Sequence, residues 1–105
     1  MGIHTLRWVP GTNSEAIAFG EWFEEQRTGY GKVFANELIT FVDRIVVHPR
    51  MYERISPGRR GHEVRRGMLE RFPILVTYVI NSTEGVILLI SHAQSPKQPR
   101  RKRLA

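Results

Sequence analysis

Residues 34–45 read FANELITFVDRI, and this stretch decides the fold of the chain. Its large apolar residues follow the intervals i, i+4, i+7, i+8 and i+11, which place them on one face of a helix. These residues are Phe34, Leu38, Phe41, Val42 and Ile45. A helix with one apolar face has to bury that face against another element. The sequence on either side must therefore supply the partner surface.

A second helix is predicted just before this one, over residues 13–27. Thr12 and Glu15 have the spacing of a capping box, which marks the start of a helix. The apolar stripe of this helix consists of Ala16, Phe19, Trp22 and Phe23. The sequence TGYG at residues 28–31 interrupts the helical pattern, and the dipeptide His48-Pro49 ends the later helix. We therefore predict an antiparallel helical hairpin whose apolar stripes, including the rings of Trp22 and Phe23, face one core.

The periodicity changes after the hairpin. Residues 62–72 read as a strand, with Gly67 as a possible bulge. Residues 74–80 and 86–91 are continuous runs rich in β-branched residues, typical of central strands covered by helices. Residues 81–85 have the composition of the hairpin loop that joins them.

At the N-terminus, residues 3–9 alternate as in a half-buried strand. The predicted order is therefore β-α-α-β-β-β, an α+β fold in which a small, mostly antiparallel sheet carries the helical hairpin on one face. We expect one domain over residues 1–95 and a basic tail, expected to be flexible, over residues 96–105.

Composition excludes several classes of function. The chain of 105 residues has no cysteine, so disulfide and thiolate chemistry are excluded. The four histidines lack ligand spacing, which predicts no metal site and no cofactor. The sequence shows no signal-peptide pattern, and its longest apolar runs are too short to span a bilayer. We therefore expect a cytoplasmic protein without a membrane partner.

Charge is distributed unevenly. Residues 59–105 hold ten basic and three acidic residues, whereas residues 1–58 hold six basic and seven acidic. The whole net charge of +6 thus comes from the second half of the chain, which is also the predicted β-rich half. A basic sheet followed by a basic tail indicates an acidic or polyanionic partner.

Within this half, Arg65, Arg66 and Arg71 are candidates for capturing phosphate or carboxylate groups. Strand alternation predicts that Arg65 and Arg71 share a face and that Arg66 points the other way. The alternative is a solvated sheet face that discourages edge-to-edge aggregation.

The tail contributes Lys97, Arg100 and Arg101 as further candidates, either in a nucleic-acid-binding arm or in a solubilising end. His92 directly follows the last apolar run and is a candidate general acid or base. The alternative for His92 is a structural role in which its ring bonds the backbone at the strand terminus.

The ordered set of these motifs resembles the RelE/ParE toxin superfamily over about residues 3–95. The resemblance is carried by AIAFGEWFEEQR at residues 16–27, GYG at 29–31, and the helix that ends in His-Pro. Further along, it is carried by VRRGMLERFP at 64–73, ILVTY at 74–78, and the strand that ends in SHA at 91–93.

The resemblance implies the growth-inhibiting toxin of a type II toxin–antitoxin pair, held inactive by a small acidic antitoxin. RelE-like members cut mRNA on the ribosome without a metal, whereas ParE-like members act on DNA gyrase. RelE-like enzymes place an arginine three residues before the tyrosine of the third strand, and here Leu75 precedes Tyr78 at that distance. Together with the wording Arg-Arg…Arg-Phe-Pro, this favours the ParE-like, plasmid-stabilisation branch.

In the ParE-like interpretation the candidate residues bind the target or the antitoxin. They are Arg65, Arg66, Arg71, His92, Lys97, Arg100 and Arg101. Two alternatives stay open. One is a ribosome-dependent endoribonuclease that uses His92 with Arg71 or Arg65, and the other is a nucleic-acid-binding module built on the tail.

Overall fold

The computed structural model describes residues 5–56, 62–81 and 84–94. Along the chain the elements are β1 (Thr5–Trp8), α1 (Thr12–Gln26), α2 (Tyr30–Val47), β2 (Glu53–Ser56), β3 (His62–Met68), β4 (Ile74–Asn81) and β5 (Glu84–His92). The predicted α+β class and the helical hairpin are confirmed. The strand β2 was not predicted, because its sequence ERIS has neither an apolar run nor clear alternation.

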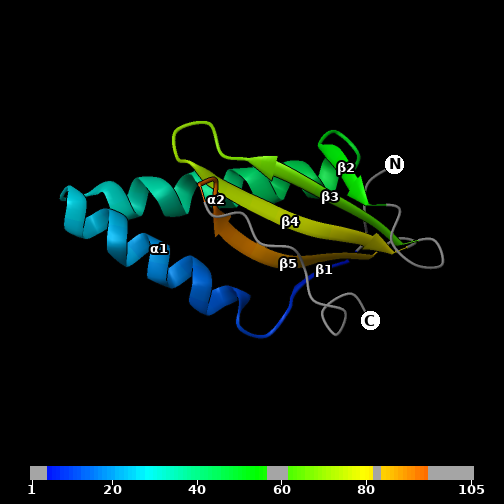
Figure 1. The fold of residues 1–105 in the computed structure, drawn as a ribbon, viewed down its shortest axis with the longest axis horizontal. Helices are drawn as coiled ribbons and strands as arrows, with labels where there is room; N and C mark the ends of the chain where they lie inside the picture. The colour runs from blue at the N-terminus through cyan, green and yellow to red at the C-terminus, as the bar shows by residue number, and fades with distance from the viewer. Residues whose placement is uncertain (1–4, 57–61, 82–83, 95–105) are drawn as a thin grey trace.

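The strands form one five-stranded sheet in the order β1-β5-β4-β3-β2. The strand β1 runs parallel to β5, and every other neighbouring pair is antiparallel. Figure 1 shows α2 lying across the sheet behind its strands, while α1 diverges from α2 and runs beside β5. No helix within the described ranges is both long and apolar enough to cross a membrane.

The main core lies between the helices and the sheet. The stripe of α2 predicted from the sequence is buried there at Phe34, Leu38, Phe41 and Ile45. Phe23 of α1 is also buried, with its ring 4.6 Å from that of Phe72. The prediction that Trp22 belongs to the core is wrong, because its side chain is 48% exposed.

A second apolar cluster lies on the opposite face of the sheet. It is formed by Val64, Val79, Val86 and Leu89, which are all buried. Strands β4 and β5 therefore carry apolar side chains on both faces. This explains why their sequences read as continuous apolar runs rather than as an alternating pattern.

The strand β3 ends at Met68, four residues earlier than predicted. The register with β4 is continuous across Gly67, so the predicted bulge is wrong. A Cβ atom at Gly67 would lie 2.7 Å from Cζ of Phe41 and would also strike the ring of Tyr52. Glycine is required here because these two rings pack directly on the backbone.

The start of α1 also differs from the prediction. Gly11 is the N-cap, with a φ of 96°, and makes no side-chain cap bond. Thr12 is therefore the first residue of the helix and not the N-cap that the predicted capping box requires. The carboxylate of Glu15 instead accepts a hydrogen bond from the backbone N–H of Ile90 in β5.

Candidate functional site

Arg65 lies inside the protein. Its side chain is 14% exposed and sits on the helix-covered side of β3. The Nη1 group donates to the carbonyl oxygens of Arg50 (3.2 Å) and Tyr52 (2.7 Å), and Nη2 donates to Glu63 Oε1 (3.0 Å). This arginine therefore ties β3 to the segment between α2 and β2, and its donors are directed away from any external partner.

Glu63 and Tyr78 complete the same network. Arg50 donates to the Glu63 carboxylate at 2.7 Å. The bond from Arg50, followed by the bond from Arg65, holds the pKa of Glu63 below its usual value. The Tyr78 hydroxyl donates to the carbonyl oxygen of Pro49 at 2.6 Å, and burial raises the pKa of that hydroxyl. Sequence reasoning missed this network because its partners come from three separate segments of the chain.

Arg66 points to the face opposite the helices, as predicted. Its Nε donates to Thr77 Oγ1 at 2.9 Å, and the side chain is half-buried. The loss of hydration lowers the pKa of its guanidinium group. Arg66 is therefore held in place by its neighbour on β4 while it faces outward from the sheet.

Arg71 lies in the turn between β3 and β4. The prediction that Arg71 shares a strand face with Arg65 is therefore wrong. The backbone N–H of Arg71 donates to Glu37 Oε2 of α2 at 3.0 Å. The turn is closed by a bond from Leu69 N to Ile74 O at 3.0 Å. The turn is thus fixed to the helix, and the side chain of Arg71 is exposed.

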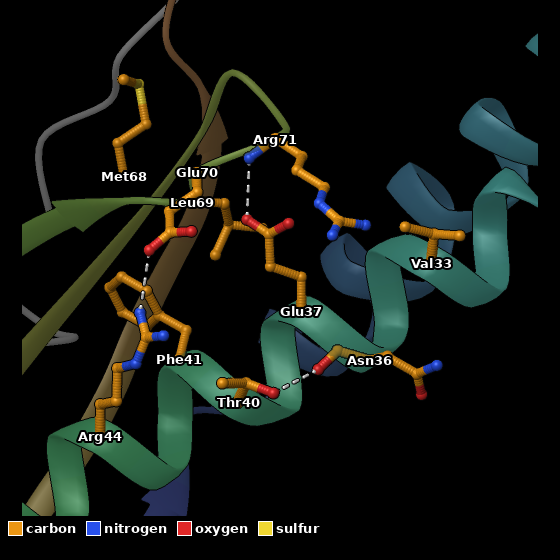
Figure 2. Close-up of a pocket in the computed structure, with 10 residues that line it drawn as sticks. All are labelled: Val33, Asn36, Glu37, Thr40, Phe41, Arg44, Met68, Leu69, Glu70 and Arg71. Carbon is orange, nitrogen blue, oxygen red and sulfur yellow. Dashed lines mark hydrogen bonds and ion pairs between the residues drawn. The ribbon is translucent and has the colours of Figure 1, made fainter.

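A shallow groove of about 330 Å³ runs between this turn and α2. Figure 2 shows the Arg71 side chain extending over it toward Val33, while the carboxylate of Glu37 turns back to the Arg71 backbone. At the other end, Arg44 Nη1 pairs with Glu70 Oε1 at 3.4 Å. The two arginines and two glutamates balance in charge. The groove therefore presents the exposed guanidinium group of Arg71, which extends from a fixed backbone, and does not form an anion pocket.

His92 ends β5 and is half-buried. Its Nδ1 accepts a hydrogen bond from the backbone N–H of Gln94 at 3.0 Å. This is the ring-to-backbone bond that the structural alternative for His92 predicted.

Of the three residues named for a ribonuclease site, Arg65 lies apart from His92. The turn that carries Arg71 lies at the same end of the sheet as His92, since Ala93 N donates to Pro73 O at 2.7 Å. Arg65 pairs with Tyr78, whereas His92 pairs with Ile74, roughly 13 Å away along β4 at the ordinary rise of a strand. The guanidinium of Arg65 is committed to Glu63 and two carbonyls, as described above. Within residues 5–56, 62–81 and 84–94, no group of three or more potential ligands could hold a metal ion.

The excess of basic residues lies outside the part of the chain that the structure describes. The described residues hold all ten acidic residues but only nine of the sixteen basic ones. The other seven, which lie outside the described residues, are Arg59, Arg60, Lys97, Arg100, Arg101, Lys102 and Arg103. The interpretation of the sheet itself as basic is therefore wrong. Its strands carry four arginines and three glutamates, so the sheet is nearly neutral, and the excess belongs to residues 57–61 and 95–105.

Comparison with known proteins identifies the fold. No family model and no curated protein matches the chain. A chain in a solved structure described as the chromosomal ParDE TA system from P. aeruginosa does match, with a TM-score of 0.64 and 18% sequence identity. The match covers 86% of this chain and 96% of that one. The chain therefore has a ParE-like toxin fold, as the motifs predicted.

Proposed function

We propose that this protein is the toxin of a type II toxin–antitoxin pair, neutralised by an acidic antitoxin, and that it inhibits DNA gyrase. The observation that carries the proposal is the fold shared with a chain of a ParDE system over 86% of the sequence. The motif order along the chain supports the same conclusion independently.

Two observations favour gyrase over the alternative of mRNA cleavage. Cleavage of RNA without a metal needs a base, an acid and positive charge gathered around one phosphate. The guanidinium group of Arg65 is bonded to Glu63 and to the Tyr52 carbonyl oxygen inside the protein. His92 pairs with Ile74, at the opposite end of β4 from Arg65. Leu75 also occupies the position where the resemblance implies an arginine. These placements support a toxin that acts by binding.

The surface proposed for the target or the antitoxin centres on Arg71. Its turn is held by Glu37, which fixes the backbone from which the exposed guanidinium group extends toward a carboxylate. Arg66 contributes from the open face of the sheet. The basic residues of the tail, Lys97, Arg100 and Arg101, supply attraction at longer range.

Induction of the protein in a bacterial host tests the target. The expected result is DNA damage signalling, filamentous cells and loss of supercoiling by purified gyrase, with mRNA intact. His92→Ala should remain fully toxic. Cut transcripts and loss of toxicity in His92→Ala would instead establish the ribonuclease. A protein that is harmless on induction but binds nucleic acid with a steep salt dependence would be a plain binding module.

The antitoxin is tested by co-expression with the product of the adjacent reading frame. We expect a stable complex and restored growth. Arg71→Gln should weaken the complex by about tenfold, as for the loss of one charge-assisted contact. Lys32→Gln is the matched control, since Lys32 is an exposed cation on α2 that does not line the groove, and should leave affinity unchanged. Equal effects of the two substitutions would contradict the assignment of Arg71.

A further inference from the structure

Among the described residues, β1 covers only part of the outer edge of β5. The strand β1 pairs its residues Thr5–Trp8 with residues 84–87 of β5, and the last backbone bond runs from Val9 N to Ile87 O. Pro10 follows and has no N–H to continue the ladder. The strand β5 itself continues to His92. Among the described residues, no strand pairs with this edge beyond Ile87.

Glu15 occupies the uncovered edge with a side chain. The backbone N–H of Ile90 donates to Glu15 Oε1 at 3.2 Å, at the long end of the range for such bonds. Strand alternation directs the backbone groups of His92 to the same edge. The carboxylate therefore stands where the carbonyl oxygen of a neighbouring strand would otherwise lie.

An apolar groove of about 680 Å³ lies beside this edge. Ala18, Phe19 and Trp22 line it from α1, and Ile90 lines it from β5. The side chain of Trp22 is 48% exposed although it belongs to the apolar side of the helix. Large side chains of an added strand would fill this groove and cover the indole ring.

The acidic residues of α1 beside the groove indicate which charges a partner would carry. The helix α1 carries four glutamates and no lysine or arginine. Glu15 lines the groove, and Glu25, three residues after Trp22 and seven after Ala18, lies on their side of the helix without lining the groove. The rim on α1 is therefore acidic, so a partner that fits it carries basic residues.

We propose that this groove binds an extended segment of a partner protein, with bulky apolar residues at alternate positions and lysine or arginine between them. Its backbone adds to the edge of β5 beyond Ile87 and replaces the carboxylate of Glu15 at the Ile90 N–H. This mode of binding uses main-chain bonds for affinity and side-chain pockets for selectivity. The site goes beyond the proposed function, whose antitoxin is acidic and meets basic residues elsewhere.

The test uses the full chain and a synthetic peptide, acetyl-KVKFKVK-amide, titrated by calorimetry. We expect saturable binding and slower hydrogen exchange at the Ile90 amide. The same peptide N-methylated at alternate residues keeps its charge and side chains but cannot pair along its backbone. It should bind at least about tenfold more weakly, as should a peptide with glutamate in place of lysine.

Substitutions in the protein locate the site. Trp22→Ala should weaken binding at least about fivefold, as for an aromatic anchor. Ala18→Arg, at an exposed position, should abolish binding without touching the core. Ile17→Ala is the matched control, since Ile17 is 62% exposed on the same helix and does not line the groove.

Three results would overturn the proposal. They are no saturable binding up to about 1 mM peptide, equal binding of the N-methylated peptide, and unchanged exchange at Ile90. Equal effects of Ile17→Ala and Trp22→Ala would overturn it as well. Toxicity on induction is independent of this titration, so the two proposals can fail separately.

Discussion

Glu63→Gln tests the network that fixes β3 to the end of α2. The substitution keeps the size of the side chain and one oxygen acceptor but removes its charge. Arg65, 14% exposed, then loses its only anionic partner among the described residues, while its bonds to the carbonyl oxygens of Arg50 and Tyr52 remain. We expect a folded but clearly less stable protein.

The magnitude follows from the two bonds to the carboxylate. The bond from Arg65 joins two side chains that are each about 15% exposed, where a charge-assisted hydrogen bond contributes about 1.5–3 kcal/mol. The bond from Arg50 belongs to a side chain that is 55% exposed, and such a pair contributes about 0–1 kcal/mol. Because the glutamine oxygen still accepts one bond, the free energy of unfolding should fall by about 2 kcal/mol. For a domain of this size, Tm should fall by about 10 °C.

The loss should depend on pH in one direction. The pKa of Glu63 is lower in the folded protein than its ordinary value of 4.5, because Arg50 and Arg65 favour the carboxylate. Ionised Glu63 therefore stabilises the fold fully above pH 4.5, and this stabilisation disappears as the pH falls through the folded pKa. The difference in unfolding free energy between wild type and Glu63→Gln should be complete at pH 7 and should shrink below pH 4.5.

Urea denaturation at a series of pH values from neutral to about 3 measures this difference. Glu70→Gln is the matched control, since Glu70 is 76% exposed and pairs with Arg44 at 3.4 Å. Its loss should be below about 0.5 kcal/mol. A Glu63→Gln difference that is the same at pH 3 and pH 7 would refute the role assigned to its charge. So would an equal effect of Glu70→Gln.

The remaining predictions concern the core beneath this network. Gly67→Ala should lower the free energy of unfolding by about 2–3 kcal/mol in urea denaturation, because the added methyl group meets the rings of Phe41 and Tyr52; an unchanged midpoint would contradict the close packing. Tyr78→Phe should cost about 1–2 kcal/mol, because the Pro49 carbonyl oxygen loses its donor. In the native protein, tyrosinate absorbance from Tyr78 should appear only when alkali unfolds the chain, since burial raises the pKa of its hydroxyl.

Much of the fold could be predicted because its determinants are local. The spacing of Phe34, Leu38 and Phe41 is a property of one helix, and it survives in the buried face of α2. The runs at residues 74–80 and 86–91 likewise became the central strands β4 and β5. The strand β2 was missed because its pairing with β3, rather than its own composition, makes it a strand.

The candidate site was predicted less well, because its chemistry depends on partners distant in sequence. Arg65, Arg66 and Arg71 look alike in sequence. In the structure, Arg65 donates to carbonyl oxygens 13 and 15 residues away. The backbone N–H of Arg71 donates to the carboxylate of Glu37, 34 residues away. Glu15 looked like a capping residue, yet its carboxylate reaches a strand 75 residues later.

The sequence by itself determined the class of fold and the amount of charge. Apolar periodicity dictates which faces must be buried, and ionisable side chains carry their charge wherever the chain places them. Only the tertiary structure decided which charges are neutralised and which meet solvent. Neutralisation depends on distances between side chains, and those distances exist only once the helical hairpin has packed on the sheet.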